Sequence, residues 1–353
     1  MYLIDTLYNS GGMEKCLTQK ANILAGEYGY EVVIVTCHQK GRPLFYSLSR
    51  CVRHIDLDVN IHFPFAIWLY LKRLREIIRC ELPDVVISLC GKELFVLDRL
   101  GDKSRKVAEF HFSYRSLQLR GKFLKLWMMR SAVRKLDRFV VLTAQDRKLW
   151  SRITGNVEQI YNFSPDSPDH PARLERKCCL CVGRMQKQKN HRDLIRAWRI
   201  VSSRHPDWEL DLYGCGVLEG MTRHLVRRYS LSESVKIHKP VKDLDPVIDS
   251  SSIFVLTSRY EGFPMVLLEA STAGVPIVSY DCPCGPSEII DDGRTGFIVA
   301  PGDREALADK ICELIENEQM RRAFGKAAYA RSRIFDRDDV MRRWDGLFRL
   351  LCK

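Results

Sequence analysis

Two glutamates in the second half of the chain carry its clearest chemical signal. Glu261 and Glu269 lie eight positions apart in EGFPMVLLE, and Glu269 is the one charged residue between Glu261 and Asp281. A carboxylate in such apolar surroundings is costly unless a hydrogen-bonding partner meets it. Hydroxyl groups of a bound ligand would be such partners, so the pair indicates a ligand site. The alternative is a solvent-facing glutamate beside an acidic turn.

Two cations in the same half could neutralise a phosphate group. Arg184 follows the apolar run CCLCVG, and Lys189 comes five residues later. The planar guanidinium of arginine and the ammonium of lysine are common partners of phosphates. The spacing indicates a phosphate site at a strand end, and the alternative is two solvated cations.

Glycines and a histidine mark further places where a ligand could approach. Gly11 and Gly12 open an expected helix, and Gly214 closes the run WELDLY. Because glycine lacks a Cβ atom, a phosphate or a sugar can lie against its backbone, especially at the start of a helix. His111 ends the run KVAEF and offers an imidazole. Ordinary turns also explain such glycines, and a lone histidine at a strand end is often structural.

The hydrophobic pattern predicts a scaffold that can bring these residues together. Apolar runs of strand length alternate with helical stretches, which is typical of parallel α/β domains. Ligands bind at the carboxyl ends of the strands in such sheets. Pro264 suits the first position of a helix that carries Glu269, and Gly274 suits its end. The expected strands include 31–37, 84–90, 106–112, 138–143, 178–184, 208–214, 234–240, 252–258 and 275–281.

The 353 residues are enough for two domains of ordinary size. The segment 161–173 contains three prolines and no periodicity, which indicates a linker. We therefore expect an α/β protein with two doubly wound, Rossmann-like domains that face each other across a cleft. Their expected bounds are 1–165 and 166–330, and a final helical stretch covers 331–353.

Composition argues against a disulfide scaffold, a zinc site and a membrane-spanning helix. The 13 cysteines include one C-x-x-C spacing at 178–181, but no second pair completes a zinc site. No secretory leader is recognisable at the start of the chain, so we expect reduced cysteines in the cytosol. The longest apolar run, 63–71, has nine residues, far fewer than the roughly 20 that a membrane-spanning helix needs.

Positive charge is concentrated in the first half of the chain. The net charge is +12, and residues 1–165 hold 26 basic and 16 acidic side chains. Residues 115–138 contain eight basic residues and one acidic residue among apolar ones such as Trp127, and residues 61–79 form a second such segment. Basic segments with aromatics suit an anionic membrane surface. The alternative is a core-packed helix with a solvated basic face, and no motif supports nucleic acid as a partner.

Taken together, the motifs resemble the retaining glycosyltransferases of family 4, which share the GT-B fold. The resemblance rests on the two glutamates and on three stretches, GFP at 262–264, AGVPIV at 273–278 and DGRTGFIV at 292–299. It extends over most of the chain and is closest in style to bacterial surface-polysaccharide enzymes. It implies that the last helix packs back on the first domain.

The resemblance also implies a role for each candidate residue. Glu261 would contact the donor sugar, and Glu269 would hold the ribose hydroxyls of its nucleotide. Arg184 and Lys189 would stabilise the departing diphosphate, and His111 would reach the sugar near the reacting carbon. The implied catalytic residues are His111, Glu261, Arg184 and Lys189, and the implied donor-binding residues are Gly11, Gly12, Gly214, Gly262, Phe263, Pro264, Met265 and Glu269.

The expected substrates follow from the same resemblance. The donor would be a nucleotide-diphosphate sugar, with UDP expected over GDP because UDP donors are commoner in the family. The acceptor would be a hydroxyl of a glycan or of a lipid-linked molecule, and the enzyme would lie peripherally at the inner face of the cytoplasmic membrane. No metal and no cofactor are expected, since the Asp-Leu-Asp triplets at 56–58 and 243–245 lack the long apolar strand that precedes such a metal motif.

Two other functions fit the same residues. A nucleotide-sugar epimerase of the GT-B fold would turn over the donor without a separate acceptor. A catalytically silent scaffold protein of an envelope-polysaccharide assembly would bind the nucleotide without turnover.

Overall fold

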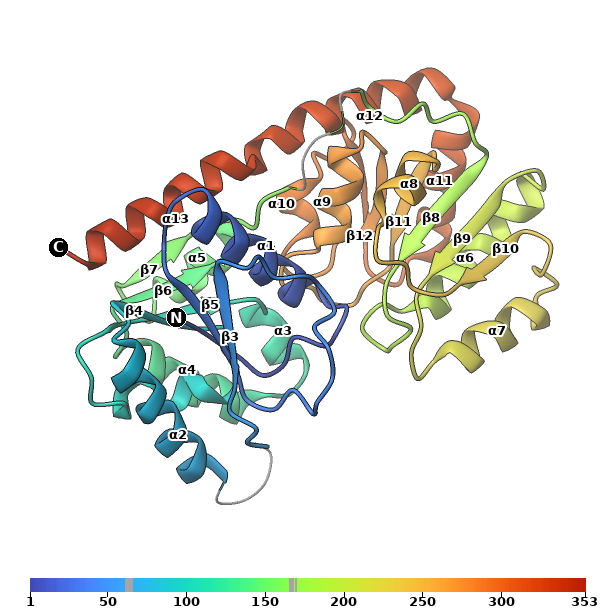
Figure 1. Cartoon of the computed structure of the whole chain (residues 1–353). Helices are drawn as coiled ribbons and strands as arrows, with labels where there is room; N and C mark the ends of the chain where they lie inside the picture. Colours follow the sequence, from blue (N-terminus) through green and yellow to red (C-terminus); the bar gives the residue numbers. More distant parts are fainter. Residues whose placement is uncertain (61–65, 165–167, 169) are drawn as a thin grey trace. The chain divides into compact units, whose positions relative to one another are not determined.

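The structure is a computed structural model that describes residues 1–60, 66–164, 168 and 170–353 (Figure 1). It contains two compact units. Unit 1 comprises Met1–Phe163 and Asp338–Lys353, and unit 2 comprises Ser164–Arg337. The expected boundary between residues 165 and 166 lies outside the described residues, as do residues 61–65 of the second basic segment.

Unit 1 is built on a sheet of seven parallel strands in the order β3-β2-β1-β4-β5-β6-β7. Strands such as β2, with the sequence VVIVT, are buried along their whole length, as expected for a parallel sheet covered on both faces. The strands are β1 (Tyr2–Ile4), β2 (Val32–Thr36), β3 (Val52–Asp56), β4 (Val85–Ser88), β5 (Arg105–Phe110), β6 (Arg138–Val141) and β7 (Val157–Gln159).

Helices cover both faces of this sheet. Helices α1 and α13 lie on one face of the sheet, and α2 and α4 lie on the other (Figure 1). Side chains of α1 and α13 share one core with the sheet, and those of α2 and α4 belong to a second core. The helices are α1 (Gly12–Gly26), α2 (Ala66–Glu81), the 3-10 helix η1 (Lys92–Arg99), α3 (Tyr114–Leu119), α4 (Phe123–Val133), α5 (Ala144–Trp150) and α13 (Arg337–Leu351). The last helix of the chain thus packs within unit 1.

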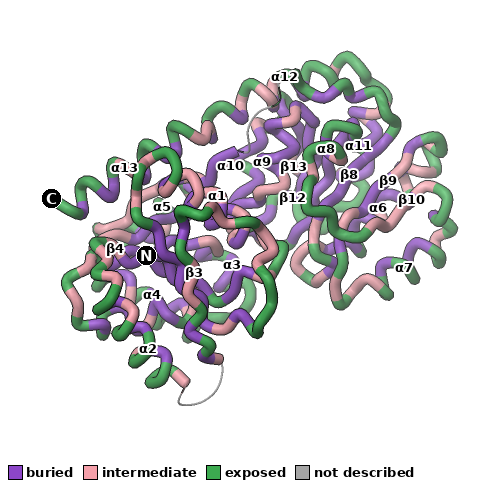
Figure 2. Tube along the Cα trace, in the orientation of Figure 1, coloured by how far each residue is buried: buried purple, intermediate pink, exposed green. Residues whose placement is uncertain are grey.

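Unit 2 contains a sheet of six parallel strands in the order β10-β9-β8-β11-β12-β13. Figure 2 shows that these strands are largely buried, whereas α7 is mostly exposed. The strands are β8 (Cys178–Val182), β9 (Glu209–Tyr213), β10 (Val235–His238), β11 (Ile253–Leu256), β12 (Ile277–Tyr280) and β13 (Gly296–Val299). The helices are α6 (His191–Arg204), α7 (Glu219–Arg228), α8 (Asp245–Asp249), α9 (Met265–Thr272), α10 (Pro286–Ile289), α11 (Arg304–Glu316), α12 (Glu318–Ser332) and the 3-10 helix η2 (Arg333–Phe335).

The predicted fold class, two doubly wound α/β halves, is confirmed, and two helix limits differ from the prediction. Helix α9 begins at Met265, so Pro264 is the N-cap and not the first helical residue. The stretch from 331 is not one helix, because α12 ends at Ser332 and α13 begins at Arg337. All 13 cysteines are free thiols. No helix in the described part of the chain is both long enough and apolar enough to cross a membrane.

Candidate active site

The structure brings two of the predicted catalytic residues of unit 2 into direct contact. Strands β8 and β11 are parallel neighbours, so the loops after them lie at one sheet edge. Lys189 Nζ lies 2.9 Å from Glu261 Oε1, and both side chains are largely buried. Gln188 supports the carboxylate loop, since its Nε2 donates to the Tyr260 carbonyl over 3.0 Å and lies 3.4 Å from Glu261 Oε2. A cation and an anion thus meet at the carboxyl end of the sheet.

Further hydrogen bonds hold these two loops together. The Arg259 N–H donates to the Gln188 carbonyl over 2.8 Å. The Thr257 hydroxyl donates to the Lys189 carbonyl over 3.0 Å. These bonds fix the backbone of both loops, and so they set the positions from which the lysine and glutamate side chains extend.

Glycines allow the strand ends to approach this closely. A Cβ atom on Gly183 would lie 3.0 Å from Cε of Lys189, so the lysine side chain crosses directly over that glycine. A Cβ atom on Gly214 would lie 2.1 Å from the Gly183 carbonyl oxygen. Gly214 therefore packs closely between two strand ends, and its contact with the donor stays a prediction.

The loop before α9 presents its predicted residues in different ways. Glu269 is buried on α9, whereas Gly262 and Met265 are partly exposed. The Phe263 ring packs edge-on against Phe335 with 5.6 Å between the ring centroids, so a donor contact at Phe263 is left to its backbone. A Cβ atom on Gly285 would lie 2.3 Å from Cδ of Pro264, which shows how tightly the two loops pack.

Arg184 differs from its predicted partner Lys189. Its side chain is exposed, and its guanidinium makes no hydrogen bond or ion pair with any residue that the structure describes. It is a cation at the end of β8 that is available to an anionic ligand.

The candidate residues of unit 1 lie at the carboxyl edge of its own sheet. Gly11 is the N-cap of α1, Gly12 is its first residue, and a Cβ atom on Gly11 would lie 2.2 Å from Oε2 of Glu14. His111 directly follows β5, and its side chain is 6% exposed. Its Nε2 lies 3.2 Å from Glu109 Oε1, which is an ion-pair distance without the angle of a good hydrogen bond.

Sequence reasoning missed the charged pair beneath His111. Lys20 of α1 forms an ion pair with Glu109 of β5, and both side chains are almost fully buried. Burial alone would raise the pKa of Glu109, but the nearby charges of Lys20 and His111 outweigh it and lower the pKa to about 2. A charged residue in the middle of the predicted strand KVAEF was the available signal, because an isolated buried carboxylate needs a partner.

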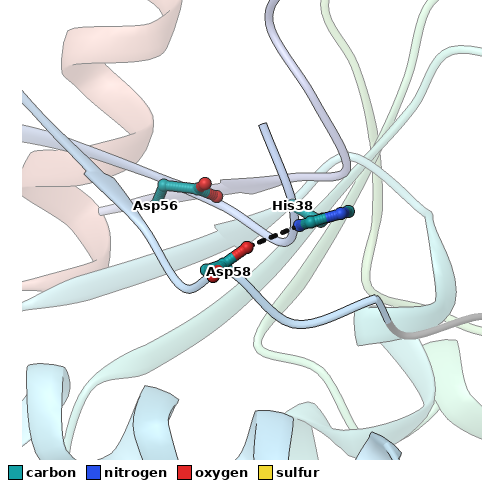
Figure 3. Close-up of side chains that lie close together, drawn as sticks. All are labelled: His38, Asp56 and Asp58. Carbon is teal, nitrogen blue, oxygen red and sulfur yellow. Dashed lines mark hydrogen bonds and ion pairs between the residues drawn. The ribbon is translucent and has the colours of Figure 1, made fainter. Parts of the chain in front are cut away.

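One group of side chains among the described residues could hold a metal ion, and it includes the first Asp-Leu-Asp triplet. Figure 3 shows His38 facing Asp58, with 2.8 Å between Nδ1 and Oδ1. Asp56 accepts hydrogen bonds from the Thr36 hydroxyl and from the Gln39 N–H. Hydrogen bonding within the protein therefore accounts for the positions of all three side chains.

The second triplet is a local turn. The Asp245 N–H donates to Asp243 Oδ1 over 3.1 Å, and Asp245 is the first residue of α8. The first triplet thus lies at the end of β3 and the second at the start of α8.

Comparison with known proteins agrees with this architecture. The family model described as "Glycosyltransferase Family 4" matches residues 10–164, and the model "Glycosyl transferases group 1" matches residues 163–331. The amylovoran biosynthesis glycosyltransferase AmsD of Erwinia amylovora is 29% identical over 98% of both chains.

Solved structures show the same fold at lower sequence identity. A TarM variant of S. aureus, in complex with Fondaparinux, alpha-GlcNAc-glycerol and UDP, has a TM-score of 0.82 at 16% identity and covers 98% of this chain and 99% of its own. HepE of Anabaena, in complex with UDP and glucose, has a TM-score of 0.81 at 17% identity and covers 98% of both chains. These structures show that the chain has the GT-B fold. Because the two family models together match residues 10–331, the chain belongs to the family 4 glycosyltransferases.

Proposed function

We propose that this protein transfers a sugar from a UDP-sugar to a hydroxyl of a glycan or lipid-linked acceptor during the synthesis of a surface polysaccharide. The observation that carries the proposal is the contact between Lys189 and Glu261 at the strand edge of unit 2. It places a cation suited to a diphosphate beside a carboxylate suited to sugar hydroxyls. The bound UDP in the TarM and HepE structures favours UDP over GDP, and the relative from Erwinia favours polysaccharide synthesis.

The proposed reaction keeps the anomeric configuration of the sugar. The bond between the sugar carbon and the diphosphate oxygen breaks, and the acceptor oxygen forms a bond to the same face of that carbon. The acceptor proton passes to an oxygen of the leaving phosphate. Arg184 and Lys189 stabilise the charge that develops on this phosphate, which is electrostatic stabilisation of the kind that lowers such barriers most. No metal is proposed.

Recognition of the donor is divided among the remaining candidates. Glu269 accepts hydrogen bonds from the ribose hydroxyls, and Glu261 accepts them from the sugar. The N–H groups at the start of α9, after Pro264, lie near the same loop and favour a negatively charged group. On unit 1, His111 donates to a sugar hydroxyl near the reacting carbon, and Gly11 and Gly12 approach the donor through their backbone.

A transfer assay with product analysis tests this function. A panel of UDP-sugars and GDP-sugars is incubated with the protein, with and without glycan and polyprenyl-diphosphate-linked acceptors. Transfer from a UDP-sugar to an acceptor, with the donor configuration retained by proton NMR, is the expected result. Conversion of the donor to another UDP-sugar without acceptor would identify an epimerase, and nucleotide binding without any turnover would identify a scaffold protein.

We further propose that unit 1 contacts an anionic membrane surface, through exposed apolar side chains of α2 and α4. Trp68 on α2 and Trp127 on α4 are 68% and 67% exposed, and Phe123 and Leu124 beside Trp127 are also exposed. The inner side of α4 packs in the core. Its outer side carries exposed apolar residues as well as basic ones, and a helix with only a solvated basic face would not expose them. Aromatic side chains beside lysines suit the interface of an anionic membrane.

Vesicle binding tests the membrane surface. The protein is centrifuged with vesicles of a neutral phosphatidylcholine alone or mixed with phosphatidylglycerol. Wild type should bind the anionic vesicles, and Trp127→Ser should bind them about tenfold more weakly, because an indole leaves the interface. Val217→Ser, which changes an exposed apolar residue on unit 2, is the matched control. Equal binding by Trp127→Ser and wild type would remove α4 from the proposal.

A further inference from the structure

A buried chain of contacts connects the C-terminal helix to His111 within unit 1. Alternate residues of a strand face opposite sides of a sheet. Ala108 and Phe110 lie in the core shared with α2 and α4, so Glu109 faces the other side, where α1 and α13 pack. Glu109 is 1% exposed and lies two residues before His111.

The Glu109 carboxylate has a partner on each oxygen. Its Oε2 pairs with the ammonium of Lys20 from α1, and its Oε1 lies 3.2 Å from His111 Nε2. A carboxylate held at both oxygens has little freedom to rotate. Of the two ring nitrogens of His111, Nε2 is the one that lies at ion-pair distance from this carboxylate.

Aromatic rings hold the lysine in turn. The Lys20 ammonium lies 4.1 Å from the centroid of the Trp344 ring on α13 and 5.5 Å from that of Tyr2 on β1. A cation over the face of an aromatic ring is attracted to it, and more strongly where water is excluded. Lys20 is 1% exposed, so the rings replace much of the water that would otherwise solvate its charge.

We infer that Glu109 is a positioning residue for His111, held by Lys20 and by Trp344 of the C-terminal helix. The inference rests on the proposed contact between His111 and the donor sugar. Through this chain, His111 and Glu109 act as one unit with Lys20 and Trp344, which are far from them in sequence. The C-terminal helix thereby supports the orientation of a side chain at the carboxyl edge of the sheet.

Turnover combined with nucleotide affinity tests the inference. Glu109→Gln/Lys20→Met removes both charges together, so that no unpaired charge stays buried. Its turnover should fall about 10²-fold, the size of loss expected when a reacting group is misplaced by about 1 Å. Its affinity for UDP should stay that of wild type, since the proposed nucleotide residues lie in unit 2. A turnover equal to that of wild type would overturn the inference.

A matched control and a double-mutant cycle separate positioning from general damage. Asp102→Asn/Lys106→Met removes another lysine–carboxylate pair of unit 1, next to the opposite end of β5, and should leave turnover unchanged. In a His111→Ala background, Glu109→Gln/Lys20→Met should cause no further loss, because the residue that it positions is absent. The same 10²-fold loss in that background would overturn the inference.

A measurement that does not depend on turnover tests the positioning role separately from the proposed function. Nitrogen-15 NMR of the His111 ring, identified by its absence in His111→Ala, reports which ring nitrogen carries the proton. Glu109→Gln/Lys20→Met should change that distribution, and an unchanged spectrum would overturn the positioning role. If His111→Ala turns over like wild type while the NMR change occurs, the proposed role of His111 fails and its positioning by Glu109 stands.

Discussion

Each unit contains a lysine–glutamate pair, and the two pairs differ in how far water reaches them. In unit 1 the side chains of Lys20 and Glu109 are 2% and 1% exposed, whereas in unit 2 those of Lys189 and Glu261 are 17% and 8% exposed. The first pair is enclosed by a sheet and two helices, and the second lies on loops at a sheet edge. The same two residue types are thus fixed in one place and able to exchange partners in the other.

Because the two pairs differ in burial, we expect them to have different roles. A fully buried pair cannot separate without leaving a charge in a medium of low polarity, which makes it suited to hold a neighbour in place. A pair with an exposed edge can release its lysine to a phosphate and its glutamate to a hydroxyl when a ligand supplies both. We therefore expect substitutions at the fully buried pair to act first on stability and those at the less buried pair to act first on turnover.

Breaking the buried pair on one side should have the largest effect on stability. Glu109→Leu or Lys20→Met leaves the other charge buried without its partner and should cost about 3–5 kcal/mol of unfolding free energy. Urea denaturation followed by circular dichroism measures this cost. The double variant Glu109→Leu/Lys20→Met should recover most of it, and a double variant as unstable as the sum of the single ones would contradict the pairing.

The next largest effect is expected when the pH is lowered, because acid removes the stability that the buried pair of unit 1 contributes. The pKa of Glu109 is lowered from 4.5 to about 2, although burial alone would raise it, because Lys20 and His111 favour the charged form. A lowered carboxyl pKa contributes stability that is present above the unfolded pKa and is lost as the pH falls through the folded pKa. Wild type should therefore lose stability between pH 4.5 and 2 more steeply than Glu109→Gln does.

The other titratable groups that face Glu109 do not interfere in this range. Burial raises the pKa of the Cys16 thiol to about 12 and raises that of Tyr2 well above its ordinary value, so both groups stay neutral in this range. Parallel stability curves for wild type and Glu109→Gln between these pH values would show that Glu109 does not contribute as described.

Changing the less buried pair should have the smallest effect on stability. Glu261→Gln should lower the unfolding free energy by less than breaking the Lys20–Glu109 pair does, since Lys189 keeps partial access to water. Its turnover should nevertheless fall about 10²-fold, because a contact to the reacting sugar is lost. Glu313→Gln, which breaks the exposed pair with Lys310 on α11, serves as the control and should retain full turnover. Normal turnover in Glu261→Gln would remove that residue from the catalytic group.

The sequence predicts the less buried pair better than the fully buried one for a physical reason. Glu261 and Lys189 each stand in a local pattern, a strand end followed by a loop of polar and glycine residues, and such patterns are visible in one stretch of chain. Their contact joins residues 72 positions apart and depends on the pairing of β8 with β11. Pattern alone predicts both residues, and only the fold shows that they touch.

The buried pair depends on long-range packing alone. Lys20 lies within an ordinary helical stretch, and Trp344 is one of several apolar residues in the last helix. They meet Glu109 because the strand order places β1 and β5 in one sheet under α1 and α13. Helix α9 begins one residue later than predicted, because Pro264 has the non-helical ψ of 89° and is therefore the N-cap, although proline favours the first helical position.

Calorimetric titration with UDP in the presence of EDTA tests the central claim most directly. Wild type should bind UDP, Lys189→Met should bind it about tenfold to hundredfold more weakly because a charged hydrogen bond is lost, and Glu269→Ala should bind it weakly as well. Glu109→Gln/Lys20→Met should bind UDP like wild type. UDP affinity that is unchanged in both Lys189→Met and Glu269→Ala would contradict the assignment of the nucleotide site to unit 2.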